Sequence, residues 1–333
     1  MDLKGQENQA LDRCSRYSYL FMAGLAVLIV YLHLATPLLA ALFAYLALSR
    51  LETRKRMGKA LAVIFFLVAV SSIAYALGYF INQTIHALPE IGDKAIPAII
   101  AWARQYGIEL PFSDYDSLKD LAFDTVKSEV RFLGSFAKFA RGASTEALFL
   151  AAGCVVAISI FLHPRFEVDA DTSTPPENLY AGCCREIAAR FRTLYASFAT
   201  VMGAQIIISA INTLLTAILV LAVQLPYAVV IIGVTFLCGL LPVVGNLLSN
   251  TIVVAIGFTV SPRMALGALI FLIVIHKLEY FLNSKIVGWR IHNPLWVMLL
   301  ALIVGERLLG IPGIILAPVV LNCVRLEMSK IAL

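Results

Sequence analysis

The sequence has few charged residues, since Asp, Glu, Lys and Arg make up only 14% of its 333 residues and 60% are hydrophobic. A typical soluble domain carries about 25% charged residues. Between Arg192 and Arg263 there is no Asp, Glu, Lys, Arg or His at all. These 70 residues would form roughly 105 Å of helix, enough for about three crossings of a 30 Å hydrocarbon core. The scarcity of charge therefore excludes a soluble enzyme, a nucleic-acid-binding protein and a disordered chain.

Sequence motifs for catalysis and metal binding are also missing. The chain has no HExxH, GxGD, GxSG or Walker sequence, and its six cysteines show no CxxC or other metal-ligand spacing. We therefore expect no enzymatic activity, no catalytic residues, no metal site and no cofactor. The net charge of +5 comes from basic residues beside apolar segments, a pattern that sets membrane orientation and does not favour nucleic acid as a partner.

The apolar runs predict an all-α, polytopic membrane protein with about eight membrane segments, some of them short or re-entrant broken helices. An extracytoplasmic amphipathic helical section is expected between two of the spans. Basic flanking residues predict that both termini are cytoplasmic, in a cell (inner) membrane. The predicted organisation is a cytoplasmic N-terminus (1–16), an N-terminal hairpin and first long span (17–81), the extracytoplasmic section (82–146), a span (147–162), a cytoplasmic loop with an amphipathic helix (163–198), a membrane transport core (199–324) and a cytoplasmic tail (325–333).

Two details of this organisation depend on particular residues. The stretch from Tyr17 to Ser49 has basic residues on both flanks, so it should turn near His33–Pro37 and return to the cytoplasm. The extracytoplasmic section should hold two or three amphipathic helices, broken near Pro89, Pro97 and the Gly107–Pro111 turn.

The transport core contains two elements that Gly and Pro interrupt, at 242–246 and at 305–313. Proline removes a backbone donor, and backbone freed at membrane depth must face protein or a water-filled cavity. Two interrupted elements that enter from opposite sides are typical of a transport site. The charges do not decide whether the short arms are re-entrant or full spans.

A polar stripe runs along the first helix of the core: Gln205, Ser209, Asn212 and Thr216 follow a spacing of i, i+4, i+7 and i+11. Two interpretations stay open for these side chains. They could form interhelical hydrogen bonds, or they could line the path of an uncharged hydroxylated solute, water or a hydrated ion.

Titratable residues mark two further positions. His276, Glu279, Tyr280 and Asn283 share one helical face, which indicates either an ion or proton path or a location at the cytoplasmic headgroups. Glu306 and Arg307 lie within the second broken element, at membrane depth if it is re-entrant and exposed outside if its arms are full spans. Adjacent residues do not face each other on a helix, so Arg307 would need a partner elsewhere, such as Glu279.

Three stretches of the core are distinctive: Leu241-Pro242-Val243-Val244-Gly245-Asn246, Tyr280-Phe281-Leu282-Asn283-Ser284-Lys285-Ile286-Val287-Gly288, and Gly305 to Pro318. Together they resemble the autoinducer-2 exporter family of permeases. The order of segments also agrees over nearly the whole chain, although Ser284 stands where the family commonly has Pro. The resemblance implies a secondary transporter, because some members resemble exporters of a small furanosyl signalling molecule and others sodium/proton antiporters. It further implies a homo-oligomer, with a pentamer among the implied assemblies.

The leading hypothesis is therefore a permease that exports a small polar solute or signalling molecule. The alternative is a sodium (or lithium)/proton antiporter, and a hypothesis of another class is a non-transporting membrane scaffold. The expected partners are the solute, Na+ or H+, membrane lipid and further copies of the chain. The predicted substrate or ion path consists of Gln205, Asn212, Pro242, Gly245, Asn246, Asn250, His276, Glu279, Asn283, Glu306 and Arg307.

Overall fold

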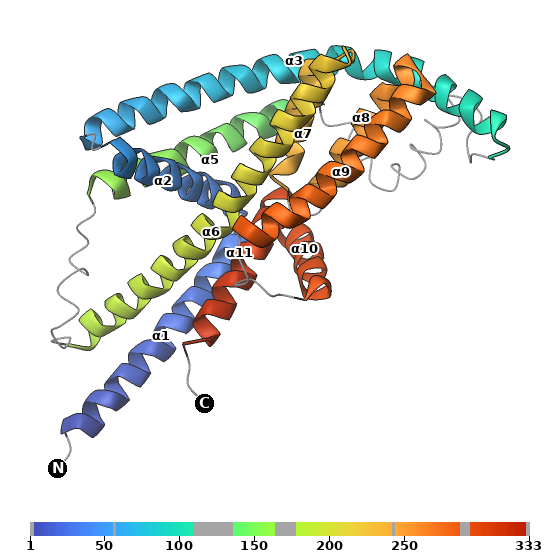
Figure 1. Ribbon diagram of the computed structural model, residues 1–333. Helices are drawn as coiled ribbons and strands as arrows, with labels where there is room; N and C mark the ends of the chain where they lie inside the picture. The colour runs from blue at the N-terminus through green and yellow to red at the C-terminus, as the bar shows by residue number, and fades with distance from the viewer. Residues whose placement is uncertain are drawn as a thin grey trace. The chain divides into compact units, whose positions relative to one another are not determined.

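A computed structural model of the chain describes residues 3–55, 58–108, 136–163, 178–241, 244–286 and 294–330, and within these ranges every regular element is an α-helix (Figure 1). The helices are α1 (Leu3–Tyr31), α2 (Ala35–Lys55), α3 (Lys59–Gln105), α5 (Phe136–Leu162), α6 (Leu179–Ala222), α7 (Ala228–Gly239), α8 (Val244–Val260), α9 (Pro262–Ile286), α10 (Leu295–Leu309) and α11 (Ile311–Met328). In the described ranges, six helices are long and apolar enough to cross a membrane, and α7 and α8 are shorter apolar helices. The prediction of an all-α, polytopic membrane protein is confirmed.

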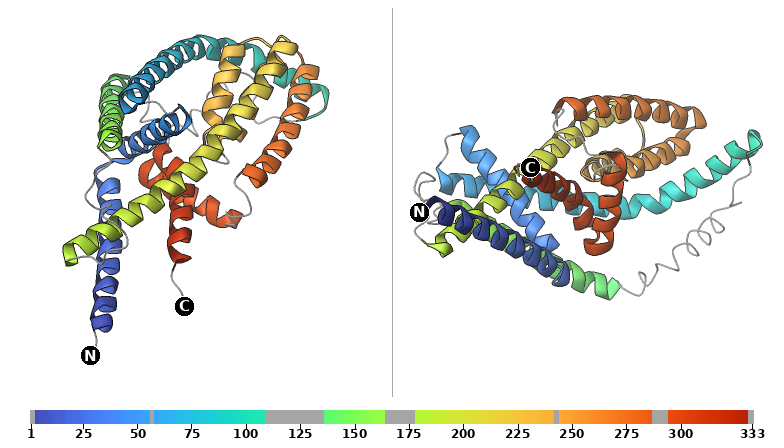
Figure 2. Two further views of the ribbon diagram at one scale, coloured as in Figure 1. Left: turned by 60° about the vertical axis from the view of Figure 1, so that its left-hand side comes forward. Right: turned by 90° about the horizontal axis from the view of Figure 1, so that it is seen from below.

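The chain divides into two compact units. The first unit contains residues 1–69, 144–201 and 292–333, and the second contains residues 70–143 and 202–291. The first unit thus holds α1, α2, α5, the N-terminal half of α6, α10 and α11. The second holds the C-terminal parts of α3 and α6 together with α7, α8 and α9, and the same helices can be followed from two further sides in Figure 2.

The N-terminal hairpin of the first unit turns where the sequence predicts. Helix α1 ends at Tyr31, and the turn places His33 in the left-handed region at φ 53° before α2 begins. After the turn, α2 packs closely on α5. The contact is so close that a Cβ atom at Gly153 would lie 2.6 Å from the Cβ atom of Ala40. Buried residues of α2, α3 and α5, among them Leu48, Phe66 and Phe161, form a core beside this contact.

The predicted helix breaks at Pro89 and Pro97 are wrong, because α3 continues through both prolines to Gln105. A proline inside a helix removes one hydrogen bond and strains the preceding turn. In α3 this cost is offset by packing, since Ala87, Ile91 and Ala95 recur every four residues and are buried in the core of the second unit. The helix ends just before Gly107, which has a φ of 68° and lies at the turn that the sequence predicts.

Helix α6 joins two elements that the sequence analysis separates. It runs without interruption from Leu179 to Ala222, so the predicted amphipathic helix around 186–198 and the charge-free helix from residue 199 form one element of 44 residues. Its N-terminal half belongs to the first unit and its C-terminal half to the second.

The first break of the core lies between α7 and α8. A Cβ atom at Gly245 would overlap the carbonyl oxygen of Cys238, and a Cβ atom at Gly239 would lie 2.6 Å from Oγ of Ser209. Both helices therefore approach their neighbours more closely than any residue with a side chain allows. Pro242 lies outside the described residues.

The second break is narrower than predicted. The sequence analysis expects an irregular insert over 305–313, but α10 continues through Glu306 and Arg307 to Leu309, and α11 begins at Ile311. Only Gly310, with a φ of 65°, separates the two helices. Gly305 and Gly313 are needed for packing instead, because a Cβ atom at either one would collide with the carbonyl oxygen of the other. The glycines thus permit a tight helical hairpin and do not interrupt the helices.

The close contact at Gly245 predicts that its replacement destabilises the protein. We expect Gly245→Ala to lower the free energy of unfolding by roughly 1–3 kcal/mol, because the new methyl group displaces the Cys238 carbonyl and with it the end of α7. The measurement is unfolding of the purified protein in detergent. Gly267→Ala is the matched control, since that glycine of α9 has no neighbouring atom within 4 Å of the new Cβ and alanine favours a helix. Equal effects of the two substitutions would contradict this account of the break.

Candidate functional site

The first half of the polar stripe on α6 holds the end of α7. Oγ of Ser209 donates a hydrogen bond of 2.7 Å to the carbonyl oxygen of Phe236, and Nε2 of Gln205 donates one of 2.6 Å to the carbonyl oxygen of Gly239. The last carbonyls of a helix lack partners within that helix, and in an apolar environment each unsatisfied group is costly. Gln205 and Ser209 therefore form interhelical hydrogen bonds, and a place of Gln205 on the solute path stays a prediction.

The second half of the stripe faces a small polar cavity inside the second unit. Buried Asn212 and Thr216 of α6 reach this cavity. The remaining lining comes from α7 (Thr235), α8 (Ser249 and Asn250) and α9 (Leu272, Ile275 and His276). Its volume of about 10 Å³ is close to the minimum that one water molecule requires. The structure thus brings together the polar side chains of four helices at one point.

The chemistry of this polar cavity is that of hydrogen-bonding side chains. The residues described as lining it offer hydroxyl, carboxamide and imidazole groups together with two aliphatic side chains, and none of them carries a carboxylate. Hydroxyl and amide groups can replace the hydrogen bonds that an uncharged solute makes with water. They do not neutralise a bare cation, whose burial without a counter-charge is far more costly.

A larger groove adjoins the polar cavity in the same unit. It has a volume of about 530 Å³ and is lined by Asn250, Leu269, Leu272, Ile273, His276 and Lys277. Asn250, Leu272 and His276 line both spaces and therefore form the wall between them. The groove has the size and mostly apolar lining that are typical of ligand sites.

Nine of the eleven predicted path residues divide into three groups. Asn212, Asn250 and His276 line the cavity. Gln205 and Gly245 lie at the break between α7 and α8, where Gln205 donates to the Gly239 carbonyl and Gly245 allows the close contact with Cys238. Pro242 lies outside the described residues, and the side chains of Asn246, Glu279 and Asn283 also lie outside what the structure describes. The proposed pairings of Glu279 with His276 and with Arg307 therefore stay predictions.

Glu306 and Arg307 belong to the last turn of α10, in the first unit, and are not among the described residues that line the cavity. Both side chains are exposed, and the backbone carbonyl of Glu306 accepts a hydrogen bond of 2.7 Å from the amide of Gly310. A basic side chain such as Arg307 is favourable at the C-terminal end of a helix.

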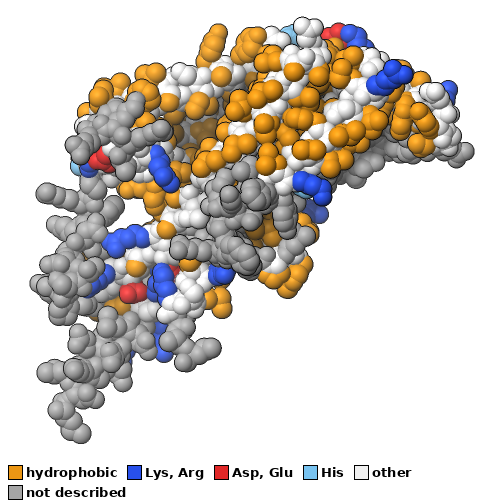
Figure 3. All heavy atoms as spheres, viewed as in Figure 1, with side chains coloured by type: hydrophobic (Ala, Val, Ile, Leu, Met, Phe, Trp, Pro, Cys, Tyr) orange, Lys and Arg blue, Asp and Glu red, His pale blue; other side chains and the backbone are white. Residues whose placement is uncertain are grey.

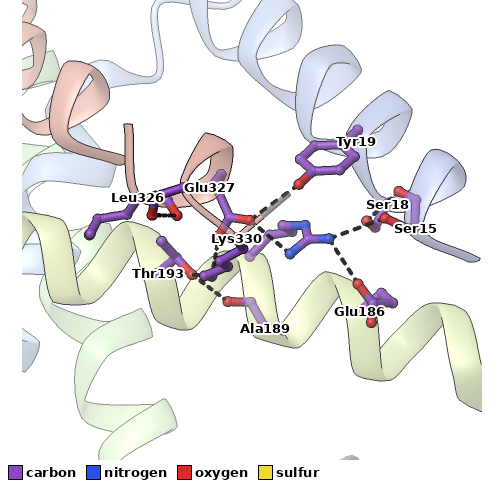
Figure 4. A network of polar contacts seen from close by, with 11 residues as sticks. Ser15, Ser18, Tyr19, Glu186, Ala189, Thr193, Leu326, Glu327 and Lys330 are labelled. Carbon is purple, nitrogen blue, oxygen red and sulfur yellow. Dashed lines mark hydrogen bonds and ion pairs between the residues drawn. The ribbon is translucent and has the colours of Figure 1, made fainter. Parts of the chain in front are cut away.

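The sequence analysis misses an ionic network in the first unit that is centred on Arg190. Its guanidinium group donates to Oε2 of Glu327 on α11 at 2.8 Å and to Oε2 of Glu186 on α6 at 2.9 Å. It also donates to Oγ of Ser15 at 3.3 Å and lies 4.3 Å from the ring centroid of Tyr19, both on α1. Figure 4 shows how Tyr19, Glu186 and Glu327 converge from the three helices.

This network ties the N-terminal helix and the C-terminal helix to α6. The side chains of Arg190 and Glu327 are each only 11% exposed, and Lys330 adds a second cation 2.8 Å from Glu327. Arg190 and Glu327 are 137 positions apart in the sequence, so no spacing pattern could link them. Two features of the sequence could have pointed to the network: the spacing of Glu186 and Arg190 at i, i+4, and the carboxylate of Glu327 near the end of an apolar helix.

A smaller ionic cluster lies on the part of α3 beyond its apolar span. Nζ of Lys94 lies 2.7 Å from Oε1 of Glu90, and both side chains are about half exposed. The Lys94 ammonium and a hydrogen bond from Tyr227 lower the pKa of the Glu90 carboxyl. Desolvation, followed by the contact with Glu90, raises the pKa of Tyr227. These contacts hold the start of α7 against α3.

Comparison with known proteins relates the chain to a transporter family and to a protein of Bacillus subtilis. The family profile described as "AI-2E family transporter" matches residues 18–326. The "Putative transport protein YdbI" of Bacillus subtilis (strain 168) is 30% identical to this chain over 122 residues. That second match covers 36% of this chain and 35% of the Bacillus protein, so the chain aligns with about a third of that relative's length.

The hydrogen bond from Ser209 predicts a loss of stability in the Ser209→Ala variant. We expect the free energy of unfolding to fall by about 1 kcal/mol, because the Phe236 carbonyl loses its donor within an apolar bundle. Thr200→Ala is the control on the same helix, since the exposed Thr200 hydroxyl donates only to the Ala196 carbonyl of its own helix. Denaturant titration in mixed micelles provides the measurement. A Ser209→Ala variant as stable as Thr200→Ala would show that α7 does not need this bond.

The Arg190 network predicts strong coupling between Arg190 and Glu327. In a double-mutant cycle with Arg190→Met and Glu327→Gln, we expect a coupling energy of about 2 kcal/mol, because each single change leaves a nearly buried charge without its main partner. The same cycle on Glu90 and Lys94, a pair that is 54% exposed on both sides, should give a much smaller coupling. Similar coupling energies for the two pairs would refute a structural role of burial in the network.

Proposed function

The chain belongs to the AI-2E family of transporters, and from this premise we propose that it is a permease for a small, uncharged polar solute. The membership confirms the resemblance that the three stretches of the core carry, and the long apolar helices make the chain a multi-pass membrane protein. A transporter family gives no support to an enzyme, and it also argues against the non-transporting scaffold.

The proposal of an uncharged polar solute rests on one observation. Polar side chains of α6, α7, α8 and α9 surround one cavity, beside the apolar core of the same unit. A solute that leaves water needs replacements for its hydrogen bonds, and hydroxyl and amide groups supply them at little electrostatic cost. The cavity residues Ser249 and Asn250 follow the α7–α8 break closely in sequence, as expected for a site built on interrupted helices.

The orientation that we propose has both termini in the cytoplasm of the cell (inner) membrane. Several basic residues lie within a few positions of the members of the Arg190 network: Arg13 and Arg16 of α1 flank Ser15, Arg192 of α6 follows Arg190, and Lys330 contacts Glu327. Basic residues are enriched on the cytoplasmic side of membrane proteins. Assembly into a homo-oligomer, including a pentamer, stays a prediction from the resemblance.

The antiporter alternative has one supporting observation, which is that His276 lines the cavity. Histidine can exchange a proton under physiological conditions and often serves in proton relays. Of the two carboxylates in that hypothesis, Glu306 is an exposed residue of the first unit, and the Glu279 side chain is not described. The described residues that line the cavity carry no carboxylate, which favours the uncharged solute.

Solute flux through reconstituted protein tests this proposal. Liposomes are loaded with ribose, glycerol or autoinducer-2, and efflux is compared between the wild type, Asn212→Leu and Thr259→Val. We expect Asn212→Leu to lower the efflux of the transported solute at least tenfold, because a buried amide of the path is lost. Thr259→Val should retain it, since that hydroxyl donates to the Ile256 carbonyl of its own helix.

A second arm of the experiment distinguishes the antiporter. The same liposomes carry a pH-sensitive dye and receive a pulse of sodium or lithium outside. Two results together would favour cation/proton exchange over transport of an uncharged solute. The first is a cation-dependent pH change that His276→Gln abolishes, and the second is unaltered solute efflux in Asn212→Leu.

A further inference from the structure

The groove beside the polar cavity has an uneven distribution of polar groups along α9. Its lining begins with Leu269, Leu272 and Ile273, at i, i+3 and i+4, and ends one turn later with His276 and Lys277. The distance along the helix from Leu269 to Lys277 is roughly 12 Å at 1.5 Å per residue. One end of the groove is therefore aliphatic and the other end is cationic and polar.

The surroundings of the groove are those of a lipid-facing surface. Ile273 of the lining is 51% exposed, and the apolar side chains of α9 beside the groove are exposed as well, with Ile270 at 55% and Val274 at 61%. On the face drawn in Figure 3, hydrophobic side chains gather over α7, α8 and α9, and Lys and Arg are sparse there. Such a surface is stable in hydrocarbon, and acyl chains can reach the groove from the side.

The lining also selects the charge of a ligand. Of the described residues around the groove, none is acidic, and Lys277 supplies a positive charge beside the polar groups of Asn250 and His276. Lysine at the edge of a membrane segment attracts anionic headgroups, with about 1 kcal/mol for each basic residue near the surface. An anionic group at this end thus has a counter-charge and hydrogen-bonding partners, whereas a cationic headgroup meets repulsion.

From these observations we infer that the groove is a binding site for an anionic phospholipid, with one acyl chain along Leu269, Leu272 and Ile273 and the phosphate at Lys277. The volume of about 530 Å³ admits a chain segment and a headgroup, and is far larger than a small solute needs. Because the wall of Asn250, Leu272 and His276 is shared, a bound chain lies directly against the polar cavity. The inference goes beyond the proposed function and does not depend on which solute is moved.

Two substitutions on α9 form the first, matched pair of the test. Lys277→Gln removes the charge at the groove, and Arg263→Gln removes an exposed charge from the other end of the same helix, outside the groove. Phosphatidylglycerol or phosphatidylcholine is added to the delipidated full chain in dodecylmaltoside, and lipid retention is measured by native mass spectrometry. We expect the wild type and Arg263→Gln to retain phosphatidylglycerol preferentially, and Lys277→Gln to bind it about fivefold more weakly.

A second pair tests the aliphatic end and does not depend on charge. Ile273→Trp fills the groove, whereas Ile270→Trp places the same bulk at a neighbouring position with nearly equal exposure that does not line the groove. Retention of phosphatidylglycerol should be lost in Ile273→Trp and kept in Ile270→Trp. Inorganic phosphate and glycerol phosphate should not compete at concentrations equal to that of the lipid, because they lack the chain.

The opposite results would overturn the inference. Equal retention in Lys277→Gln and Arg263→Gln, or in Ile273→Trp and Ile270→Trp, would show that lipid does not occupy the groove. A change of oligomeric state confined to Ile273→Trp, without a change in lipid preference, would assign the groove to a second copy of the chain. Since the readout is lipid retention and not flux, a negative result would leave the proposed transport function standing.

Discussion

The second unit depends on how a helix can end inside an apolar bundle. Helix α7 has only 12 residues, or roughly 18 Å, and stops at Gly239, well short of a 30 Å hydrocarbon core. Its final carbonyls have no partners within the helix and need donors from elsewhere. Gln205 and Ser209 of α6 provide these donors, and the missing side chain at Gly239 lets α6 come close enough to do so. The polar stripe on α6 is therefore first a requirement of the fold.

The polar cavity follows from the same arrangement. Once Gln205 and Ser209 are fixed on α7, the helical repeat directs Asn212 and Thr216 toward the same side of α6, one and two turns further on. There they meet Thr235 of α7 and Ser249 of α8 in the interior. The interhelical hydrogen bonds thus belong to the first half of the stripe, and the side chains that line the cavity belong to its second half. The variants Ser209→Ala and Asn212→Leu address one half each.

Local sequence signals predicted the features that depend on few residues. The hairpin turn at His33, the break near Gly245 and the face shared by Gln205 and Asn212 all follow from proline, glycine and helical spacing. The same signals were wrong for α3, where burial of Ala87, Ile91 and Ala95 offsets two prolines. They also overestimated the second break, because Gly305 and Gly313 are used for close helix packing and only Gly310 has an unusual backbone conformation.

Contacts between residues far apart in the sequence could not be predicted from these local signals. The Arg190 network joins three helices, and the sequence contains many basic residues that could equally have been solvated at the membrane surface. The participation of His276 in the cavity was likewise open, because twelve apolar residues before it are too few to fix its depth. In both cases the deciding information is the packing of helices, which no short segment encodes.

The position of the glycine contacts limits how the cavity can widen for a solute larger than one water molecule. Helix α8 is held at its start, where Gly245 contacts Cys238, and near its end, where a Cβ atom at Gly257 would lie 2.8 Å from Cα of Ala265. The second contact also fixes the start of α9. His276 lies eleven residues beyond Ala265, roughly 16 Å along the helix, so a small rotation of α9 about this contact would displace His276 more than the residues nearer to Ala265. Together with Asn250, His276 and Leu272 form the wall that the cavity and the groove share, so such a rotation would change both spaces at once.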